Sequence, residues 1–354
     1  MSKLRLGVIG AGSWAVSAHL PALAARGDEV EFVGVCRSDS EPLEKIRGKF
    51  GFEMCSTDYR DVLACDLDIA VVASPSALHH EHATAALRSG AHLLLEKPMT
   101  IRAAEAWDIV RVAEQNDRQL LVSFGWNYMD IINTAVTAVR DIGIGSLEHM
   151  TIHMSSQTRE LLSNTGHYPD AAPDTLPQTS TWTNPAVSGG GYGQAQLSHA
   201  LALALSLVPE EEVVGAFALT SSPLDAPVEL HDAATLQFAG GGIATLSGGS
   251  SHMGAWGNKH ELVVRGIGSE GQFIVDVHRE LVWVYRPDGT EFTAKLGPSA
   301  GAYQASGPAN ALVDVALGHT EANRADGKLG ARTVDALELV YASAAAGRMI
   351  RKHD

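Results

Sequence analysis

The sequence has only three cysteines in 354 residues, and no two of them form a CxxC pair. An odd number of widely spaced cysteines favours a reducing compartment over a disulfide framework. No apolar run reaches the roughly 18 residues that span a membrane. The apolar segment that begins at Leu6 is interrupted by glycines and does not resemble a signal peptide. We therefore expect a cytoplasmic chain that does not interact with membranes.

Positive charge is also scarce, and the net charge of −15 argues against nucleic acid as a partner. Hydrophobic residues make up 45% of the chain and charged residues 19%, which is typical of a globular protein with a large core. The length favours two domains. A metal site is not expected: neighbouring histidines in the run 79–82 diverge on a helix, and no third ligand accompanies His79 and His82.

A glycine motif follows the first predicted strand, residues 4–9, and a helix is expected from there to about residue 25. The motif has the form G-x-G-x-x-A, with Gly10, Gly12 and Ala15 at the defined positions. Gly10 permits the tight turn, Gly12 allows close approach of a pyrophosphate, and Ala15 allows the helix to pack on the strand. This context predicts a dinucleotide-binding turn.

The second predicted strand, residues 31–36, ends in Arg37-Ser38. An acidic residue at this point binds the ribose 2′-hydroxyl of NAD, whereas an arginine accommodates the 2′-phosphate of NADP. Arg37 therefore favours NADP(H), with Ser38 adding a hydroxyl. NAD(H) remains possible, because Asp39 or Glu41 could reach the ribose instead.

Two further buried strands end in polar residues. Residues 68–73 lead into Ser74-Pro75, with His79 close behind, and Leu93-Leu94-Leu95 lead into Glu96-Lys97-Pro98. Charges are costly at the end of a buried strand unless they are used, and ligands of α/β sheets bind at the carboxyl ends of strands. Lys97 is thus expected to point toward the place where cofactor and substrate meet. The histidines at 79–82 either line this crevice or lie on a helix surface.

A helix is predicted over residues 103–116 and a strand over 120–125, followed by Asn127. Up to residue 125 strands alternate with helices, which predicts a doubly wound parallel sheet. These motifs together resemble the glucose-fructose oxidoreductase/inositol dehydrogenase (Gfo/Idh/MocA) family, and Glu96-Lys97-Pro98 is the most specific of them.

The resemblance implies a Rossmann domain, residues 1–125, followed by an α+β domain, residues 126–354, built on a large, mostly antiparallel sheet. It implies hydride transfer between a nicotinamide and a sugar, glycoside or cyclitol carbon, and a Lys97–Pro98 peptide that is cis. The cofactor would contact Gly10, Gly12, Ser13, Trp14, Ala15, Arg37, Ser38, Ser74, Pro75, His79, Glu96, Lys97 and Asn127.

In the second half a helix is expected over 131–142 and an alternating strand over 147–156. Further strands are expected near 212–221, 229–238, 243–250, 260–266, 271–277 and 280–286, and helices near 308–318 and 330–351. A polar loop, 158–187, separates the first strand from the rest. Within it Trp182 either stacks on a sugar ring or packs its own loop. An apolar sheet face favours a homodimer or homotetramer.

The glycine run at 189–191 precedes a helix that carries His199. In the family an Asp four residues before this His orients it, but here that position is Ala195. The departure weakens an inositol-type assignment and favours relatives that act on 3-keto sugars or glycosides. The expected substrate contacts are Lys97, Gln157, Trp182, Tyr192, Gln196 and His199.

Lys97 is the first candidate for the catalytic acid/base, and His199 is the second. Burial near a cationic nicotinamide would lower the pKa of Lys97 toward neutrality. Two other functions remain open: an enzyme that uses a retained cofactor transiently to cleave or epimerise glycosides, and a nucleotide-binding sensor without catalysis.

Overall fold

The computed structural model describes residues 2–167, 176–252, 260–297 and 299–352. The chain divides into two compact units. The first comprises residues 1–125, 171–178 and 305–331, and the second comprises 126–170, 179–304 and 332–354. Among the described residues, every helix is too short or too polar to cross a membrane.

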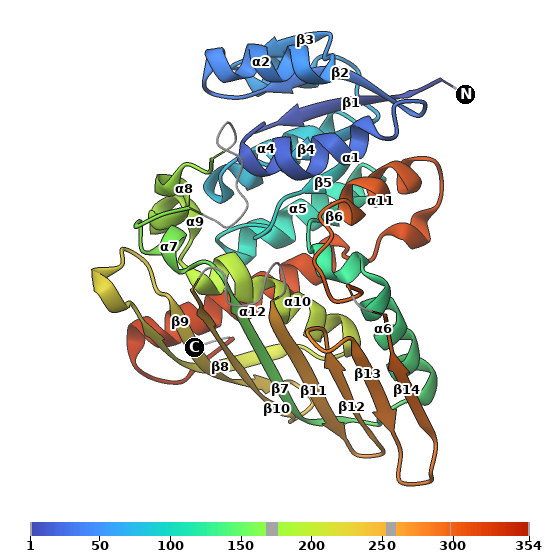
Figure 1. Cartoon of the computed structure of the whole chain (residues 1–354), viewed down its shortest axis with the longest axis vertical. Helices are drawn as coiled ribbons and strands as arrows, with labels where there is room; N and C mark the ends of the chain where they lie inside the picture. The colour runs from blue at the N-terminus through green and yellow to red at the C-terminus, as the bar shows by residue number, and fades with distance from the viewer. Residues whose placement is uncertain (1, 168–175, 253–259, 298, 353–354) are drawn as a thin grey trace. The chain divides into compact units, whose positions relative to one another are not determined.

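The first unit is built on a six-stranded parallel sheet with the strand order β3-β2-β1-β4-β5-β6 (Figure 1). Its strands are β1 Leu4–Ile9, β2 Val30–Cys36, β3 Met54–Ser56, β4 Ile69–Val72, β5 His92–Leu95 and β6 Leu120–Val122. Its helices are α1 Leu20–Ala24, α2 Ser40–Phe50, α3 Tyr59–Leu63, α4 His79–Arg88, α5 Ala103–Gln115 and α11 Gly307–Ala316. The order of the strands reverses between β1 and β4, which is where open α/β sheets bind ligands.

The central strands of this sheet are apolar on both faces, as predicted for parallel strands covered by helices. All four residues of β4 are buried, and Leu93, Leu94 and Leu95 of β5 are fully buried. The predicted Rossmann sheet is thereby confirmed. Its last strand ends at Val122 rather than at residue 125, because Gly125–Tyr128 forms a 3-10 turn.

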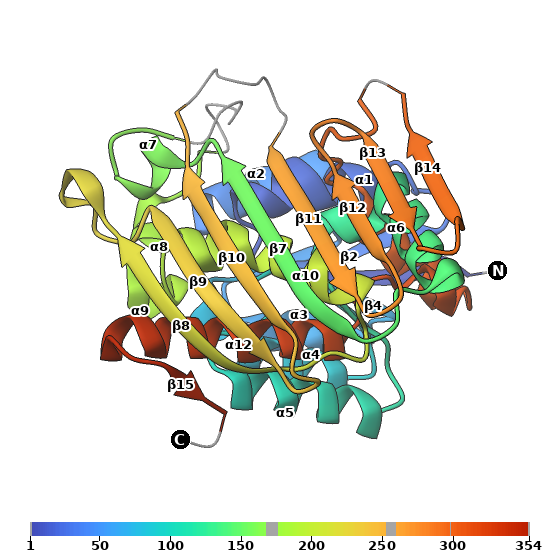
Figure 2. The ribbon, with the colours of Figure 1, turned by 90° about the horizontal axis from the view of Figure 1, so that it is seen from below.

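The second unit contains a nine-stranded sheet with the order β14-β13-β12-β11-β7-β10-β9-β8-β15 (Figure 2). All neighbouring strands are antiparallel except β7 and β10. The strands are β7 Leu147–Ser156, β8 Val213–Ser221, β9 His231–Phe238, β10 Ile243–Ser250, β11 Glu261–Gly268, β12 Gln272–Asp276, β13 Leu281–Tyr285, β14 Glu291–Lys295 and β15 Ile350–Arg351. The expected large, mostly antiparallel sheet is confirmed.

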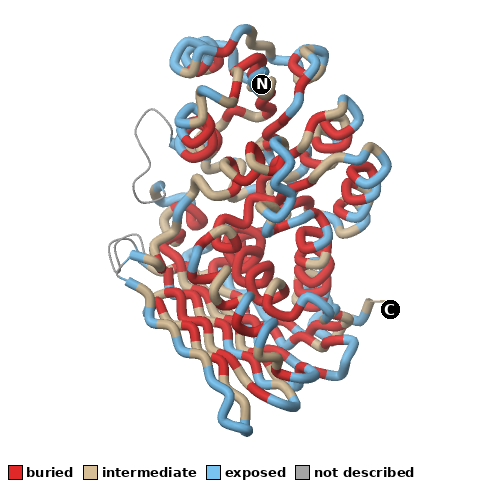
Figure 3. The backbone as a smooth tube through the Cα atoms, turned by 90° about the vertical axis from the view of Figure 1, so that its right-hand side faces the viewer, coloured by how far each residue is buried: buried red, intermediate tan, exposed pale blue. Residues whose placement is uncertain are grey.

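The helices of the second unit are α6 Asp130–Ile142, α7 Arg159–Leu162, α8 Thr179–Thr183, α9 Pro185–Ser188 and α10 Ser198–Leu207. Helix α12 Gly327–Ala346 begins in the first unit, which extends to residue 331, and continues in the second. Helix α6 packs on β13 and helix α10 on β7. Met150, Ile152 and Met154 of β7 face the helices and are fully buried, whereas the residues between them are half-buried. Figure 3 shows this alternation of buried and exposed positions along the strands.

The structure corrects several predicted boundaries. The polar loop 158–187 contains the short helices α7, α8 and α9, and its residues 168–175 lie outside the described part. The last helix ends at Ala346 rather than near residue 351, and Ile350–Arg351 pairs with β8. Strand β14 was not predicted, because it is only five residues long and Phe292 and Ala294 are its only apolar residues.

Candidate cofactor and substrate site

The glycine turn after β1 is held against the ends of two neighbouring strands. The backbone N–H groups of Gly10 and Ala11 both donate to the carbonyl of Cys36, at 3.0 Å each. Gly10 has φ +84°, and a Cβ on it would lie 2.3 Å from the backbone nitrogen of Ser74. Both the left-handed backbone and this close packing therefore require glycine at position 10.

Gly12 differs, because no protein atom fills the space of its missing side chain. The nearest atom to a Cβ built there is the carbonyl oxygen of Gly10, at 3.9 Å. The protein's own packing does not require glycine here, so the space is available to a ligand. No acidic residue lies in the following π turn Ala15–His19, so nothing there opposes a phosphate at the helix N-terminus. The turn thus fits the pyrophosphate of a dinucleotide.

The side chain of Arg37 lies over the glycine turn. Its Nη1 donates to the carbonyl of Ala11 at 3.1 Å, and its Nη2 lies 3.4 Å from Asp39. Ser38 is exposed beside it, and Asp39 precedes helix α2. The structure therefore brings a cation, a hydroxyl and a carboxylate to the end of β2, and both alternatives for the ribose remain available.

His79 is buried, and its side chain contacts two loops. Its Nε2 lies 2.7 Å from the carbonyl of Ser74, and its Nδ1 lies 3.0 Å from the carbonyl of Pro98. Burial lowers the pKa of His79, against the opposing effect of these carbonyls and of Glu96. Because both ring nitrogens face backbone carbonyls, His79 connects the loops that contain Ser74 and Pro98. His82 binds the Ser74 hydroxyl at 2.9 Å.

Glu96 and Lys97 follow β5 directly. The Lys97–Pro98 peptide is cis, as the family resemblance implied. Burial lowers the pKa of Lys97, and the negative charge of Glu96 opposes this shift only in part. A lysine amine with a lowered pKa gives up its proton more readily than an ordinary lysine, as a general base requires.

Asn127 is 2% exposed, and neither of its amide atoms has a hydrogen-bond partner within the described part of the chain. A buried amide without partners is costly, and such groups commonly await a ligand or water. This observation fits the predicted contact with the cofactor.

In the second unit the structure brings together two of the predicted substrate residues, Tyr192 and Gln196. Ser156, at the end of β7, lies 3.1 Å from the Tyr192 hydroxyl and 3.3 Å from Oε1 of Gln196. Gln157 is buried next to Ser156, and Trp182 is half-buried in α8.

The predicted residues omit two groups that support this part of the site. Oε1 of Glu229 accepts the N–H groups of Gly191 and Gly193, at 2.7 and 3.2 Å, and the hydroxyl of Tyr341, at 2.5 Å. These contacts fix the glycine run that leads into α10. A local sequence pattern gives no signal for them, because Tyr341 lies 112 residues from Glu229.

The imidazole of His199 lies in a group of aromatic rings. Its centroid is 6.0 Å from that of Tyr303, which is in turn 4.9 Å from Trp126 and 6.5 Å from His260. His199 itself is 5% exposed. At the position of the expected Asp the chain has Ala195, and the aromatic ring next to His199 is that of Tyr303.

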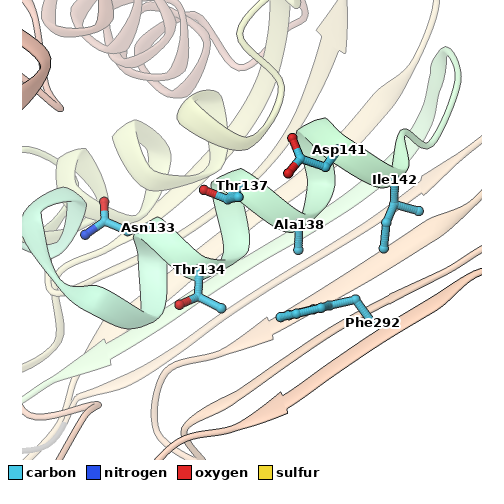
Figure 4. A pocket seen from close by; sticks show the side chains of 7 residues that line it. All are labelled: Asn133, Thr134, Thr137, Ala138, Asp141, Ile142 and Phe292. Carbon is cyan, nitrogen blue, oxygen red and sulfur yellow. The ribbon is translucent and has the colours of Figure 1, made fainter.

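A separate groove of about 480 Å³ lies between α6 and β14 and contains none of these residues. Asn133, Thr137 and Asp141 of α6 line it, and Phe292 of β14 lies across from Ala138 (Figure 4). Its one carboxylate, Asp141, pairs with Arg140 at 2.9 Å. The groove therefore offers no acid/base pair. In the part of the chain that the structure describes, no three His, Cys, Asp or Glu side chains gather as a metal site would require.

Comparison with known proteins agrees with this geometry. Residues 4–124 match the oxidoreductase family with an NAD-binding Rossmann fold, GFO_IDH_MocA. A dTDP-3,4-didehydro-2,6-dideoxy-α-D-glucose 3-reductase of Streptomyces violaceoruber is 30% identical over 301 residues, which cover 81% of this chain and 79% of the relative. A glycosyl hydrolase family 109 protein of Shewanella amazonensis is 31% identical over 188 residues, which cover 48% of this chain and 40% of the relative.

The fold is shared with solved structures of low sequence identity. A levoglucosan dehydrogenase in complex with NADH and levoglucosan has a TM-score of 0.77 and 18% identity, with 100% of both chains covered. Together, the N-terminal match and the relative that aligns with four-fifths of the sequence show that this chain belongs to the Gfo/Idh/MocA oxidoreductase family with an NAD-binding Rossmann fold.

Proposed function

We propose that the protein transfers a hydride between a nicotinamide cofactor, NADP(H) in preference to NAD(H), and carbon 3 of a sugar or glycoside. The observation that carries this proposal is Lys97, an amine of lowered pKa directly after β5 in a family of NAD-binding oxidoreductases. The name of the Streptomyces relative, a sugar 3-reductase, supports carbon 3. The absence of a carboxylate at Ala195 supports a keto sugar over a cyclitol.

The protein's part in this reaction is to bind the reactants and to move one proton. The glycine turn, Arg37, Ser74 and Asn127 would hold the cofactor, which when bound supplies or accepts the hydride. Lys97 Nζ takes the hydroxyl proton in oxidation and returns it in reduction. His199 binds the reacting oxygen or serves as its proton partner, and Gln157, Trp182, Tyr192 and Gln196 bind the sugar hydroxyls.

The absorbance of reduced nicotinamide tests the proposal. Purified protein is mixed with NADPH and a panel of 3-keto sugars, and separately with NADP⁺ and the corresponding sugars and glycosides. We expect oxidation of NADPH only with ketones at carbon 3. A protein that binds NADPH tightly and leaves the whole panel unchanged in both directions would exclude the proposed reaction.

The proposed NADP preference depends on Arg37. Replacing Arg37 with aspartate should weaken NADPH binding by about tenfold or more, because a charge-assisted contact with the 2′-phosphate is replaced by repulsion. NADH binding should be unchanged or tighter. Fluorescence titration of both cofactors measures this, with Arg47→Asp on exposed helix α2 as the control. Equal loss of NADPH and NADH affinity in Arg37→Asp would show that Arg37 only supports the turn.

A second function is supported by the similarity to a glycosyl hydrolase family 109 protein. In this alternative the cofactor stays bound and is oxidised and reduced within one catalytic cycle, so that a glycoside is cleaved with no net change in nicotinamide. Chromatography of the same reaction mixtures distinguishes the two functions. Release of the aglycone without a change in NADPH absorbance would favour the hydrolase.

We also propose that the outer face of the nine-stranded sheet pairs with a second copy of the chain. This face carries Phe217, Leu219, Ile243 and Ile267, which are 42, 64, 49 and 45% exposed. Ile243 and Ile267 flank His149 in one row across β10, β7 and β11. Sedimentation should give a dimer or tetramer that Leu219→Glu dissociates. A wild-type monomer at micromolar concentration would contradict this.

A further inference from the structure

A buried histidine–carboxylate pair connects the glycine turn to Lys97, and the proposed chemistry leaves it without a role. His19 is the last residue of the π turn Ala15–His19 that follows the glycine motif, and helix α1 begins at the next residue. π turns are rare and are frequently found at functional sites. His19 is 1% exposed, and its Nε2 lies 2.6 Å from Oε1 of Glu96.

The second oxygen of Glu96 is also occupied. Oε2 accepts the backbone N–H of Lys97 at 3.0 Å, and the hydroxyl of Ser123 makes a further hydrogen bond to the carboxylate. Burial raises the pKa of Glu96, but the contacts with His19, Lys97 and Ser123 outweigh burial and leave the pKa below its usual value. One buried carboxylate thus contacts both the helix after the cofactor turn and the backbone of Lys97.

We propose that His19 is a positioning residue for Lys97: by donating a hydrogen bond to Glu96, it keeps this side chain an oriented carboxylate against the Lys97 backbone. The inference rests on the proposed function, which gives Lys97 its role as acid/base. A carboxylate only accepts hydrogen bonds, so Nε2 of His19 carries the hydrogen. Nδ1 of His19 has no hydrogen-bond partner among the described residues. The contact with Glu96 therefore requires only one hydrogen-bond donor on the side chain of residue 19.

This arrangement has a consequence for Lys97 that a purely structural histidine would not have. The ionisable groups around Glu96 are His19, His79 and Lys97. The negative charge of Glu96 holds the pKa of Lys97 up against burial. If residue 19 cannot donate, the buried Glu96 takes up a proton more readily, its charge is lost, and the pKa of Lys97 falls further.

The test follows the titration of Lys97 in the full-length protein, independently of turnover. Lysines are methylated with ¹³C-formaldehyde, and the signal of Lys97 is identified by its absence in Lys97→Arg. We expect the pKa of Lys97 to fall by about one unit in Glu96→Gln and in His19→Leu. In His19→Gln, which keeps a donor, it should stay near the wild-type value. His80→Leu is the matched control, because the half-buried His80 of α4 pairs with Asp108 of α5 at 2.9 Å, away from Glu96, and should not affect Lys97.

The same variants separate this inference from the proposed function. If the enzyme is active, His19→Leu should lower kcat at least tenfold and shift its pH profile to lower pH, with KM for the sugar nearly unchanged. If no substrate is found, the titration of Lys97 alone still tests the inference. An unchanged Lys97 pKa in both His19→Leu and Glu96→Gln would overturn the inference, as would a His19→Gln variant that behaves like His19→Leu. If His19→Leu does not fold, the other two variants still test the inference. The pKa of Lys97 should fall in Glu96→Gln and stay near the wild-type value in His19→Gln.

Discussion

Replacing Lys97 with alanine should reduce turnover by about 10²–10⁴-fold, the usual contribution of a general acid/base. Affinity for NADPH should change little, because the glycine turn and Arg37 rather than Lys97 are proposed to hold the phosphates. Burial lowers the pKa of Lys97, so its neutral amine forms at a lower pH than that of an ordinary lysine. Oxidation requires this neutral form and should accelerate as pH rises through the Lys97 pKa. Reduction requires the ammonium form and should slow over the same range.

Two further variants complete this test. One separates the loss of proton transfer from the loss of positive charge, and the other is a control. Lys97→Arg keeps the positive charge but cannot give up its proton, so it should be nearly as inactive as Lys97→Ala. Lys45→Ala removes a lysine that pairs with Glu41 on the exposed surface of α2, and it should leave turnover unchanged. The measurement is steady-state kinetics with NADPH titration of each variant. Near-normal turnover in Lys97→Ala would show that Lys97 is not the acid/base and would favour His199 for this role.

Replacing Gly10 with alanine should weaken cofactor binding at least tenfold and also lower the stability of the fold. Alanine at φ +84° costs about 1–2 kcal/mol, and its Cβ would lie 2.3 Å from the Ser74 nitrogen, so backbone must move. The displaced turn would also shift the open space at Gly12 in which a pyrophosphate is proposed to lie. Calorimetric titration with NADPH and thermal unfolding measure the two effects.

Two other glycines serve as controls for this result. Gly12→Ala should leave stability nearly unchanged and still lose cofactor affinity, because only open space lies within 3.9 Å of its Cβ. Gly51 has φ +76° with nothing within 4 Å of a Cβ, so Gly51→Ala should lose stability through strain alone and bind cofactor normally. Unchanged cofactor affinity in both Gly10→Ala and Gly12→Ala would mean that this turn does not bind a dinucleotide.

The elements that could be predicted from the sequence are those with a strong apolar pattern. Residues 4–9, 147–156 and 243–250 form strands with the bounds that were predicted. Strand β14 was not predicted from the sequence. Its side chains are exposed or half-buried, so packing in the core places little constraint on its residues. The π turn at 15–19 also gives no signal, because its residues are compatible with an ordinary helix.

The residues of the candidate site also differ in whether the sequence could predict them. Gly10, Gly12 and Lys97 could be found because each lies in a short motif whose spacing reflects local geometry. His19 could not, because its partner Glu96 lies 77 residues away and only the folded sheet brings them together. Glu229 and Tyr341 are linked in the same non-local manner. The surroundings of His199 were also missed, since Tyr303 and His260 come from separate connections.

The measurement that tests the proposed reaction most directly follows the hydride itself. NADPH carrying deuterium at the transferring position of the nicotinamide is incubated with the protein and a 3-keto sugar, and the product is analysed by NMR. We predict deuterium at carbon 3 of the sugar, incorporated at least about a hundredfold more slowly in the Lys97→Ala variant. Deuterium at another carbon would contradict the proposed position, and a sugar product that contains no deuterium would contradict hydride transfer to the sugar altogether.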